Sequence, residues 1–155
     1  ISNYQLMMQL IDFCREHDSI DDILALPDVK ERVELFKEQQ PKFREQIERC
    51  SRIKKNVIVL DLRNEDTIYA GNRFMIYALF PQCNISIHVL WGKNNQNTVF
   101  AIGKSILNKT SKTNVGELCL SYGGGGHNAA GTCQVDNLKA DELLTEVIGK
   151  INKDG

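Results

Sequence analysis

A run of four glycines followed by a histidine and an asparagine is the stretch of this 155-residue sequence with the most distinctive chemistry. Ordering glycine costs more backbone entropy than ordering any other residue, so such a run indicates positive φ or close backbone approach. Without side chains in the way, consecutive amides can converge on an anion, and a neighbouring imidazole can donate to an oxyanion. A tight surface turn is the alternative interpretation. We predict an anion site built from Gly123, Gly124, Gly125, Gly126 and His127, with Asn128 as a secondary contact.

The two familiar nucleotide-binding motifs do not describe this run. A P-loop would require a lysine followed by serine or threonine, and no lysine follows the glycines before Lys139. A dinucleotide-binding fingerprint would require a strand before the glycines and a helix opening on the last one, and the sequence predicts neither. The anion site must therefore be of another kind.

Metal-ion chemistry has few candidate ligands in the sequence. Five cysteines are scattered without a Cys-x-x-Cys pair, which argues against a zinc site and against a disulfide framework. We interpret His88, in an alternating apolar stretch, as a structural residue of a strand, and His17 as part of a solvated helix end. No nucleophile motif is present. We therefore predict neither a metal site nor a catalytic residue in this chain.

The composition is typical of a protein that folds in water, with 42% hydrophobic and 25% charged residues. No apolar run approaches the roughly 20 residues that span a bilayer, and no signal-peptide pattern is present. We expect no membrane contact and, because the cysteines suggest no disulfides, a cytoplasmic location. The formal net charge of -1 provides no general attraction for duplex nucleic acid, so an anion must be bound locally.

Before residue 56 the sequence is helical. Apolar residues at three- and four-residue spacing predict amphipathic helices at 4–16 and 28–53, the second kinked or divided by Pro41. Between them, Ser19 and Asp22 have the spacing of a capping box. We assign residues 1–55 to a helical connector. Because the sequence opens inside a helical pattern, we expect it to start partway through a longer protein.

From residue 56 onward strands and helices alternate. Strands are predicted at 56–62, at 85–90 and 98–102 as a β-hairpin, and at 131–135. Helices are predicted at 72–80, 114–121 and 138–151. Residues 56–155 are therefore predicted to form an α/β (α+β) domain. Its sheet is expected to be mixed and partly antiparallel, with four to five strands flanked by helices.

The segment GGGGH-N-AAG at residues 123–131 resembles the signature of the DHH-associated domain, which follows the catalytic domain in DHH-family phosphoesterases. The resemblance extends loosely over residues 56–152, and the first fifty residues resemble the helical connection between the two halves of such proteins. It implies the substrate-binding domain of a metal-dependent phosphoesterase. The classes it suggests are exopolyphosphatase-related proteins, nano-oligoribonucleases and phosphoadenosine-phosphate phosphatases.

The resemblance also implies further contacts to phosphate or sugar. Residues 71–74 and 103–108 look like those of the exopolyphosphatase-related branch, so the expected contacts are Arg73, Lys104, Ser105 and Asn108. Several relatives carry an arginine where Lys104 stands, and lysine offers a point charge in place of a bidentate fork. We expect Arg73 to compensate; a solvated cation at a helix start is the alternative.

The Asp-His-His motif that gives the family its name is absent from the sequence. The resemblance therefore implies divalent metal, with manganese expected, in a missing N-terminal DHH domain, and turnover only in the full-length protein. Expected partners are that domain and a phosphate ester, short oligonucleotide or polyphosphate substrate, and a homodimer is left open. One alternative is a nucleic-acid-binding module such as a tRNA-synthetase appendage without hydrolytic activity. Another is a regulatory domain with a vestigial glycine loop.

Overall fold

The computed structural model describes all 155 residues, which divide into two compact units. Unit 1 comprises Ile1–Phe43 with Tyr69–Gly71, and unit 2 comprises Arg44–Ile68 with Asn72–Gly155. The boundary predicted from the sequence, between the connector 1–55 and the domain 56–155, lies twelve residues further along the chain than the end of the first segment of unit 1. None of the helices is both long enough and apolar enough to cross a bilayer.

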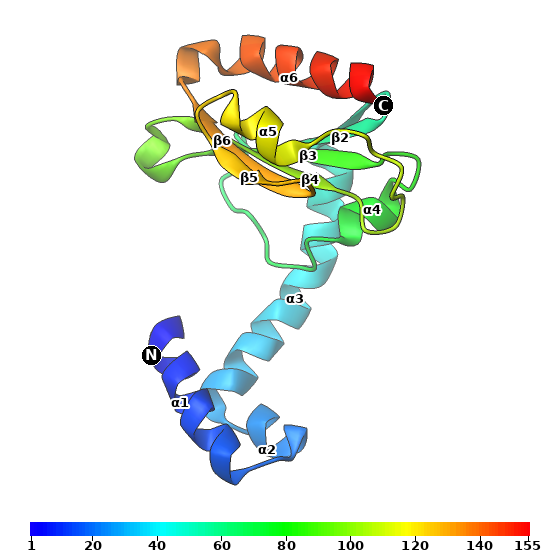
Figure 1. Ribbon diagram of the computed structural model, residues 1–155. Helices are drawn as coiled ribbons and strands as arrows, with labels where there is room; N and C mark the ends of the chain where they lie inside the picture. The colour runs from blue at the N-terminus through cyan, green and yellow to red at the C-terminus, as the bar shows by residue number, and fades with distance from the viewer. The chain divides into compact units, whose positions relative to one another are not determined.

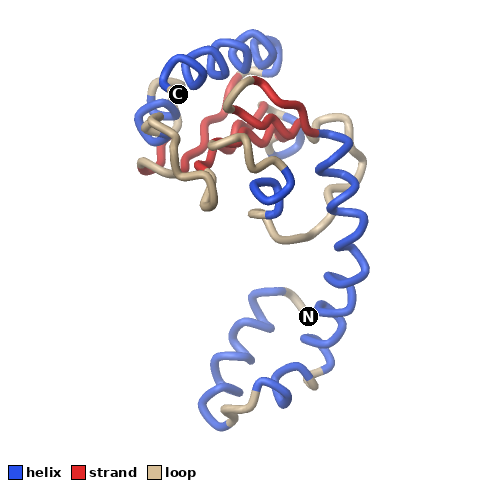
Figure 2. Tube along the Cα trace, turned by 90° about the vertical axis from the view of Figure 1, so that its right-hand side faces the viewer, coloured by secondary structure: helices blue, strands red, loops and turns tan.

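Unit 1 is helical (Figures 1 and 2). It contains α1 (Asn3–Glu16), α2 (Ile20–Leu24) and the first part of α3 (Pro27–Cys50). The capping box lies at α1, where the Ser2 hydroxyl accepts from the Gln5 amide and the Gln5 side chain accepts from the Ser2 amide. The box predicted at Ser19 is wrong, because that side chain makes no capping hydrogen bond. Pro41 lies inside one continuous helix.

Unit 2 is built on a six-stranded sheet in the order β1-β2-β3-β4-β6-β5, and only the β2–β3 pair is parallel. Its strands are β1 (Ser51–Lys54), β2 (Val57–Asp61), β3 (Ile85–Trp91), β4 (Thr98–Lys104), β5 (Gly125–His127) and β6 (Ala130–Val135). The predicted mixed sheet is confirmed, with six strands in place of four to five. One unpredicted strand, β1, replaces the end of the predicted helix 28–53, and the other, β5, is part of the glycine run.

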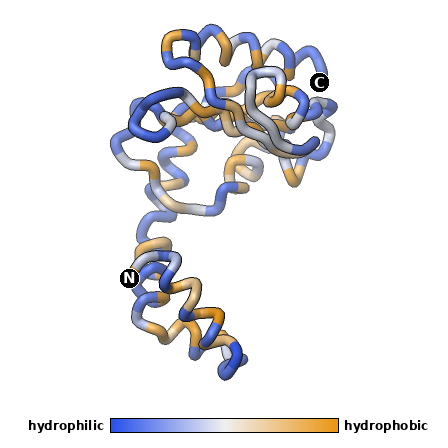
Figure 3. Tube along the Cα trace, turned by 60° about the vertical axis from the view of Figure 1, so that its left-hand side comes forward, coloured by the Kyte–Doolittle hydropathy of each residue, from blue (hydrophilic) through white to orange (hydrophobic).

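Alternate residues of the strands form the hydrophobic core on one face of the sheet. Inward-facing residues of β2, β3, β4 and β6, such as Val59 and Phe100, are fully buried there. Helices α5 (Val115–Leu120) and α6 (Ala140–Asp154) cover this face (Figure 1). Along α6 hydrophobic and hydrophilic residues alternate turn by turn, as expected for a helix with one buried stripe (Figure 3). The Asn114 cap of α5 is confirmed, since its side chain accepts from the Glu117 amide.

The opposite face of the sheet carries α4 (Met75–Leu79), which is shorter than the predicted helix 72–80. The Tyr77 hydroxyl joins α4 to the sheet, because it lies 2.9 Å from the Ser86 hydroxyl and donates to the Gly103 carbonyl at 3.1 Å. Burial raises the pKa of Tyr77, so this hydroxyl stays protonated as a donor. The helix is thereby fixed above β3 and β4.

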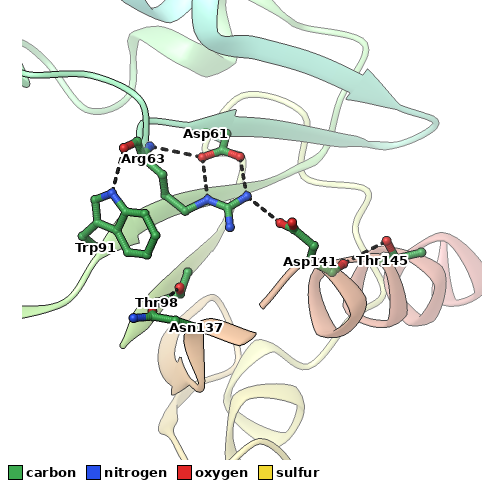
Figure 4. A network of polar contacts seen from close by, with 7 residues as sticks. All are labelled: Asp61, Arg63, Trp91, Thr98, Asn137, Asp141 and Thr145. Carbon is green, nitrogen blue, oxygen red and sulfur yellow. Dashed lines mark hydrogen bonds and ion pairs between the residues drawn. The ribbon is translucent and has the colours of Figure 1, made fainter. Parts of the chain in front are cut away.

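A charged network ties the end of β2 to the start of α6 (Figure 4). The Arg63 guanidinium donates to both carboxylate oxygens of Asp61, at 3.0 and 2.7 Å, and to Asp141 at 2.8 Å. Burial alone would raise the pKa of Asp61, but the hydrogen bonds and charge of Arg63 outweigh it and lower that pKa. The Trp91 indole donates to the Arg63 carbonyl at 2.7 Å, which fixes the segment after β2 beside the end of β3.

Candidate functional site

A cavity of about 410 Å³ opens on the face of the sheet that carries α4. We call it the α4 cleft. Its lining comes from the turn before α4, from α4 itself, from β3 and β4, and from the hairpin of β5 and β6. Besides His88, three basic side chains line it, Arg73, Lys104 and His127, and no carboxylate does. The cleft thus brings together three side chains that the sequence placed at an anion site.

Small residues make room for the cleft above the sheet. The strand register pairs Gly103 of β4 with Ala130 of β6, and both line the cavity together with Ala101. A Cβ atom at Gly103 would lie 3.0 Å from the Tyr77 hydroxyl oxygen, closer than side chains normally pack. Larger residues on this face would fill the cavity or displace α4.

His127 is the last residue of β5 and is exposed at the edge of the cleft. Its Nδ1 accepts a hydrogen bond from the Ala129 amide at 3.3 Å. Because a neutral imidazole carries one proton, this contact places that proton on Nε2. His127 therefore offers an N–H donor at the cleft.

Lys104 lies at the end of β4 and is joined to the hairpin by both its backbone and its side chain. The Lys104 amide donates to the Ala129 carbonyl at 2.9 Å, and its ammonium donates to the Asn128 side-chain oxygen at the same distance. A further contact reaches the Ser111 carbonyl at 3.4 Å. The structure thus pairs Asn128 with Lys104, and these neutral acceptors leave the positive charge of the ammonium uncompensated.

Arg73 stands in the turn that leads into α4. The turn is fixed by Asn72, whose side chain accepts from the Phe74 amide at 3.0 Å and whose carbonyl accepts from the Met75 amide at 2.9 Å. The Arg73 guanidinium lies 5.0 Å from the centre of the Phe74 ring, within the range of a cation–π contact. No carboxylate lies within ion-pair distance of it, so its fork is available to an anion.

The glycine run does not form the predicted nest of four free amides. The Gly123 amide donates to the Leu120 carbonyl at 3.0 Å and the Gly124 amide to the Cys119 carbonyl at 2.9 Å, so both cap the end of α5. Gly125 and Gly126 belong to β5 and pair with Thr132 and Gly131 of β6. None of the four glycines lines the α4 cleft.

The glycines instead allow backbone segments to pack against one another. A Cβ atom at Gly124 would collide with the Thr132 carbonyl oxygen, and one at Gly126 with the Ala130 carbonyl oxygen. Gly126 also has a φ of 153°, which side-chain-bearing residues rarely adopt. The run therefore shapes the hairpin that carries His127 and Asn128.

Ser105 and Asn108 have local roles that the sequence did not reveal. Ser105 is buried, and its hydroxyl accepts from the amides of Leu107 at 3.1 Å and Asn108 at 3.0 Å. The Asn108 side-chain amide donates to the Pro81 carbonyl at 3.2 Å. Both residues stabilise the turn after β4, and neither lines the cleft.

Two aromatic side chains and a histidine are among the cleft residues that were not predicted as site residues. Tyr77 enters the cleft from α4, Phe74 from the residue before that helix, and His88 from β3. Burial lowers the pKa of His88, which keeps this imidazole neutral near pH 7. Alternation within the strand gave one signal, because it placed His88 on the same face as Ser86, away from the core. Nothing in the sequence showed that α4 would leave this face open beside it.

No group of three or more histidine, cysteine, aspartate or glutamate side chains in the structure could hold a metal ion. The cleft contains two imidazoles and no carboxylate, whereas a pair of divalent cations requires several anionic ligands. The lining of the cleft therefore offers positive charge and hydrogen-bond donors, and not the anionic ligands of a two-metal centre.

Comparison with known proteins finds a close relative among solved structures. No family model matches the chain, and a comparison with curated protein sequences finds no match. Among solved structures, the chain is 61% identical to a pGpG-specific phosphodiesterase, PggH from Vibrio cholerae, with a TM-score of 0.88. The match covers 100% of this chain and 52% of that protein, so the chain spans about half the length of this relative.

A more distant likeness concerns the fold alone. An exopolyphosphatase-related protein from Bacteroides fragilis is 14% identical, with a TM-score of 0.54, over 96% of this chain and 44% of that protein. The GGGGH-N-AAG segment lies in the hairpin beside the cleft, and the full-length identity of 61% is to a phosphodiesterase. On these grounds the chain belongs to the DHH phosphoesterase family, as a DHH-associated domain.

Proposed function

We propose that this chain binds the substrate of a DHH-family phosphodiesterase and holds its phosphate in the α4 cleft. The observation that carries the proposal is the lining of that cleft, where Arg73, Lys104 and His127 meet without any carboxylate. The chain as a whole has 19 basic and 20 acidic residues, so this local excess of positive charge does not follow from composition. Such a site attracts an anion locally, although the net charge of the whole molecule does not.

The three side chains offer complementary contacts to a phosphate. The Arg73 fork can donate two parallel hydrogen bonds, and His127 can donate one from Nε2. The Lys104 ammonium has three donors, of which two reach Asn128 and Ser111, so one remains for a ligand. Because Asn128 holds the ammonium in place, less side-chain entropy is lost when a ligand binds.

The relative and the size of the cleft both support a substrate class for this proposal. PggH is described as specific for pGpG, a linear dinucleotide, which supports a short nucleotide substrate here. A cavity of about 410 Å³ lies within the range of small-molecule sites, roughly 300–1,000 Å³. Polyphosphate and phosphoadenosine phosphate offer the same phosphate chemistry and serve as comparison ligands.

Hydrolysis in this proposal requires groups from outside these 155 residues. A divalent cation, with manganese as the expected metal, would supply an activated water and neutralise charge on the leaving oxygen. Its ligands would come from a DHH domain, because the cleft has none of the carboxylates that such a site needs. The contribution of this chain is to position the ester, which by itself supplies part of a rate gain.

Calorimetric titration of the 155-residue chain with pGpG tests the proposal. His127→Ala and Arg73→Ala should each lower the affinity by roughly 10- to 150-fold, because a hydrogen bond to a charged group is worth about 1.5–3 kcal/mol. Arg52→Ala is the matched control, since Arg52 is exposed on β1 and does not line the cleft. Unchanged affinity in both cleft variants, or an equal loss in the control, would refute the assignment.

A further inference from the structure

The interior of the α4 cleft carries a polar side chain that the phosphate contacts do not use. His88 lies on β3, opposite Ala101 of β4, on the same face of the sheet as Ser86. Its side chain is partly buried, and its ring makes no hydrogen bond, ion pair or ring contact within the protein. Buried polar groups in folded proteins are mostly hydrogen-bonded to protein or water, and an imidazole without a protein partner that faces a cavity is open to a ligand that replaces water.

The other polar groups around His88 are already engaged. The Tyr77 hydroxyl contacts the Ser86 hydroxyl at 2.9 Å and the Gly103 carbonyl at 3.1 Å, and the Ser86 hydroxyl also lies 3.4 Å from that carbonyl. The neighbouring small residues offer no side-chain hydrogen bond. The two ring nitrogens of His88 are therefore the side-chain donor and acceptor left uncommitted on the floor of the cleft.

The chemistry of His88 differs from that of the basic residues. A neutral imidazole has one N–H donor and one nitrogen acceptor, a pairing that matches the edge of a nucleobase, where donors and acceptors stand side by side. Phosphate oxygens are acceptors only, so they can use the donor of such a ring and leave its acceptor unpaired. Phe74, 37% exposed beside the cleft, adds an aromatic surface on which a flat base can stack.

We propose that His88 recognises the nucleobase of a ligand whose phosphate is held by Arg73, Lys104 and His127. The cleft then selects nucleoside phosphate esters over polyphosphate, because only the former places a base against the floor. The inference rests on the proposed function, since it uses the same cleft and the same phosphate contacts. It adds a specificity-determining residue that lies on β3, away from the glycine hairpin.

Two ligands separate recognition of the base from binding of phosphate. The 155-residue chain is titrated with pGpG and with tripolyphosphate, as wild type, His88→Ala, His88→Gln and His127→Ala. We expect His88→Ala to weaken pGpG binding by roughly 3- to 10-fold, the range for a neutral hydrogen bond, and to leave tripolyphosphate binding unchanged. His88→Gln retains a donor and an acceptor and should recover most of the pGpG affinity.

The outcomes also distinguish this inference from the function on which it rests. An equal loss for both ligands in His88→Ala, or no loss for either, contradicts recognition of the base by His88. If His127→Ala still weakens both ligands in that case, the phosphate site survives; if it weakens neither, the proposed function fails as well.

A measurement on the unmodified protein guards against a variant that does not fold. In wild type labelled with ¹⁵N histidine, pGpG should shift the ring nitrogen resonances of His88, and tripolyphosphate should leave them in place. Resonances that do not move with pGpG would overturn the proposal.

Discussion

The two histidines of the α4 cleft differ in the contacts that they already make. His127 is exposed, and its Nδ1 is occupied by the Ala129 amide, so one nitrogen remains for a ligand. His88 is partly buried with both nitrogens unoccupied, and burial keeps it neutral. The two imidazoles therefore offer different groups to the cleft: a single nitrogen at the rim from His127, and a neutral donor and acceptor on the floor from His88.

At this scale, burial of His88 predicts a pH-dependent stability. Because burial lowers the folded-state pKa of His88 below its ordinary value of 6.5, the unfolded chain binds that proton more readily. Stability should be unaffected above pH 6.5 and should fall as the pH drops from 6.5 to the folded-state pKa. The slope cannot exceed one proton, about 1.4 kcal/mol per pH unit.

Urea denaturation of wild type and His88→Gln between pH 5 and pH 8 measures this effect. Glutamine does not titrate, so the free energy of unfolding of wild type should fall relative to the variant on the acid side only. The other titratable groups that line the cleft, Arg73, Tyr77, Lys104 and His127, are the same in both proteins. Parallel pH profiles would show that His88 titrates alike in the folded and unfolded states.

At the scale of elements, the β5–β6 hairpin depends on glycines for the close packing of its backbone. Gly124 packs directly against the Thr132 carbonyl, whereas a Cβ atom at Gly125 would have nothing within 4 Å. Gly124→Ala should therefore lower the free energy of unfolding by about 1–3 kcal/mol, the range for overpacking a filled site. Gly125→Ala, one residue away, is the matched control and should change it by less than about 0.5 kcal/mol.

Thermal or urea unfolding of the two glycine variants decides between close packing and a flexible loop. A flexible loop would tolerate both alanines, because neither added methyl group would meet fixed backbone. Equal and small effects would thus contradict the packing that the structure shows around Gly124.

The elements that sequence could predict are those whose residues carry an intrinsic preference. The β-branched and apolar runs at β2, β3, β4 and β6 identified four strands, because such residues favour a half-buried pleated surface. The strand β5 is Gly-Gly-His and has no such preference, so only its partner β6 defines it. The residues of β1 continue the helical spacing of apolar residues in α3, so they were predicted as helix. They form a strand because they pair with β2.

The same limit applies to the site. Residue type and spacing indicated His127, and the family resemblance indicated Arg73 and Lys104, but neither showed which turns would form around them. Ser105 and Asn108 were predicted to contact phosphate or sugar; in the structure Ser105 accepts from two amides of its own turn, and Asn108 donates to the Pro81 carbonyl after α4. His88 could not be recognised as a cleft residue, because the cavity exists only once α4 is placed above β3 and β4.

For the molecule as a whole, charge decides which kind of ligand can bind. The net charge is -1, and the three basic residues of the cleft are a local exception. A general nucleic-acid-binding module would instead track a backbone with many cations and would release many counterions. A site for one or two phosphates neutralises few charges whatever the length of the ligand.

The salt dependence of binding therefore tests the choice between these two functions. If the two cations of the cleft, Arg73 and Lys104, both contact phosphate, the logarithm of the affinity should fall with the logarithm of salt concentration with a slope of roughly 1.4 in magnitude, from about 0.7 per contact on a single strand. The slope should be the same for pGpG and for a 12-nucleotide RNA, since the cleft holds only one end of a strand. A slope that steepens with RNA length would show that the strand continues across the surface. In that case binding along nucleic acid, and not capture of a short phosphate ester, would be the function of this chain.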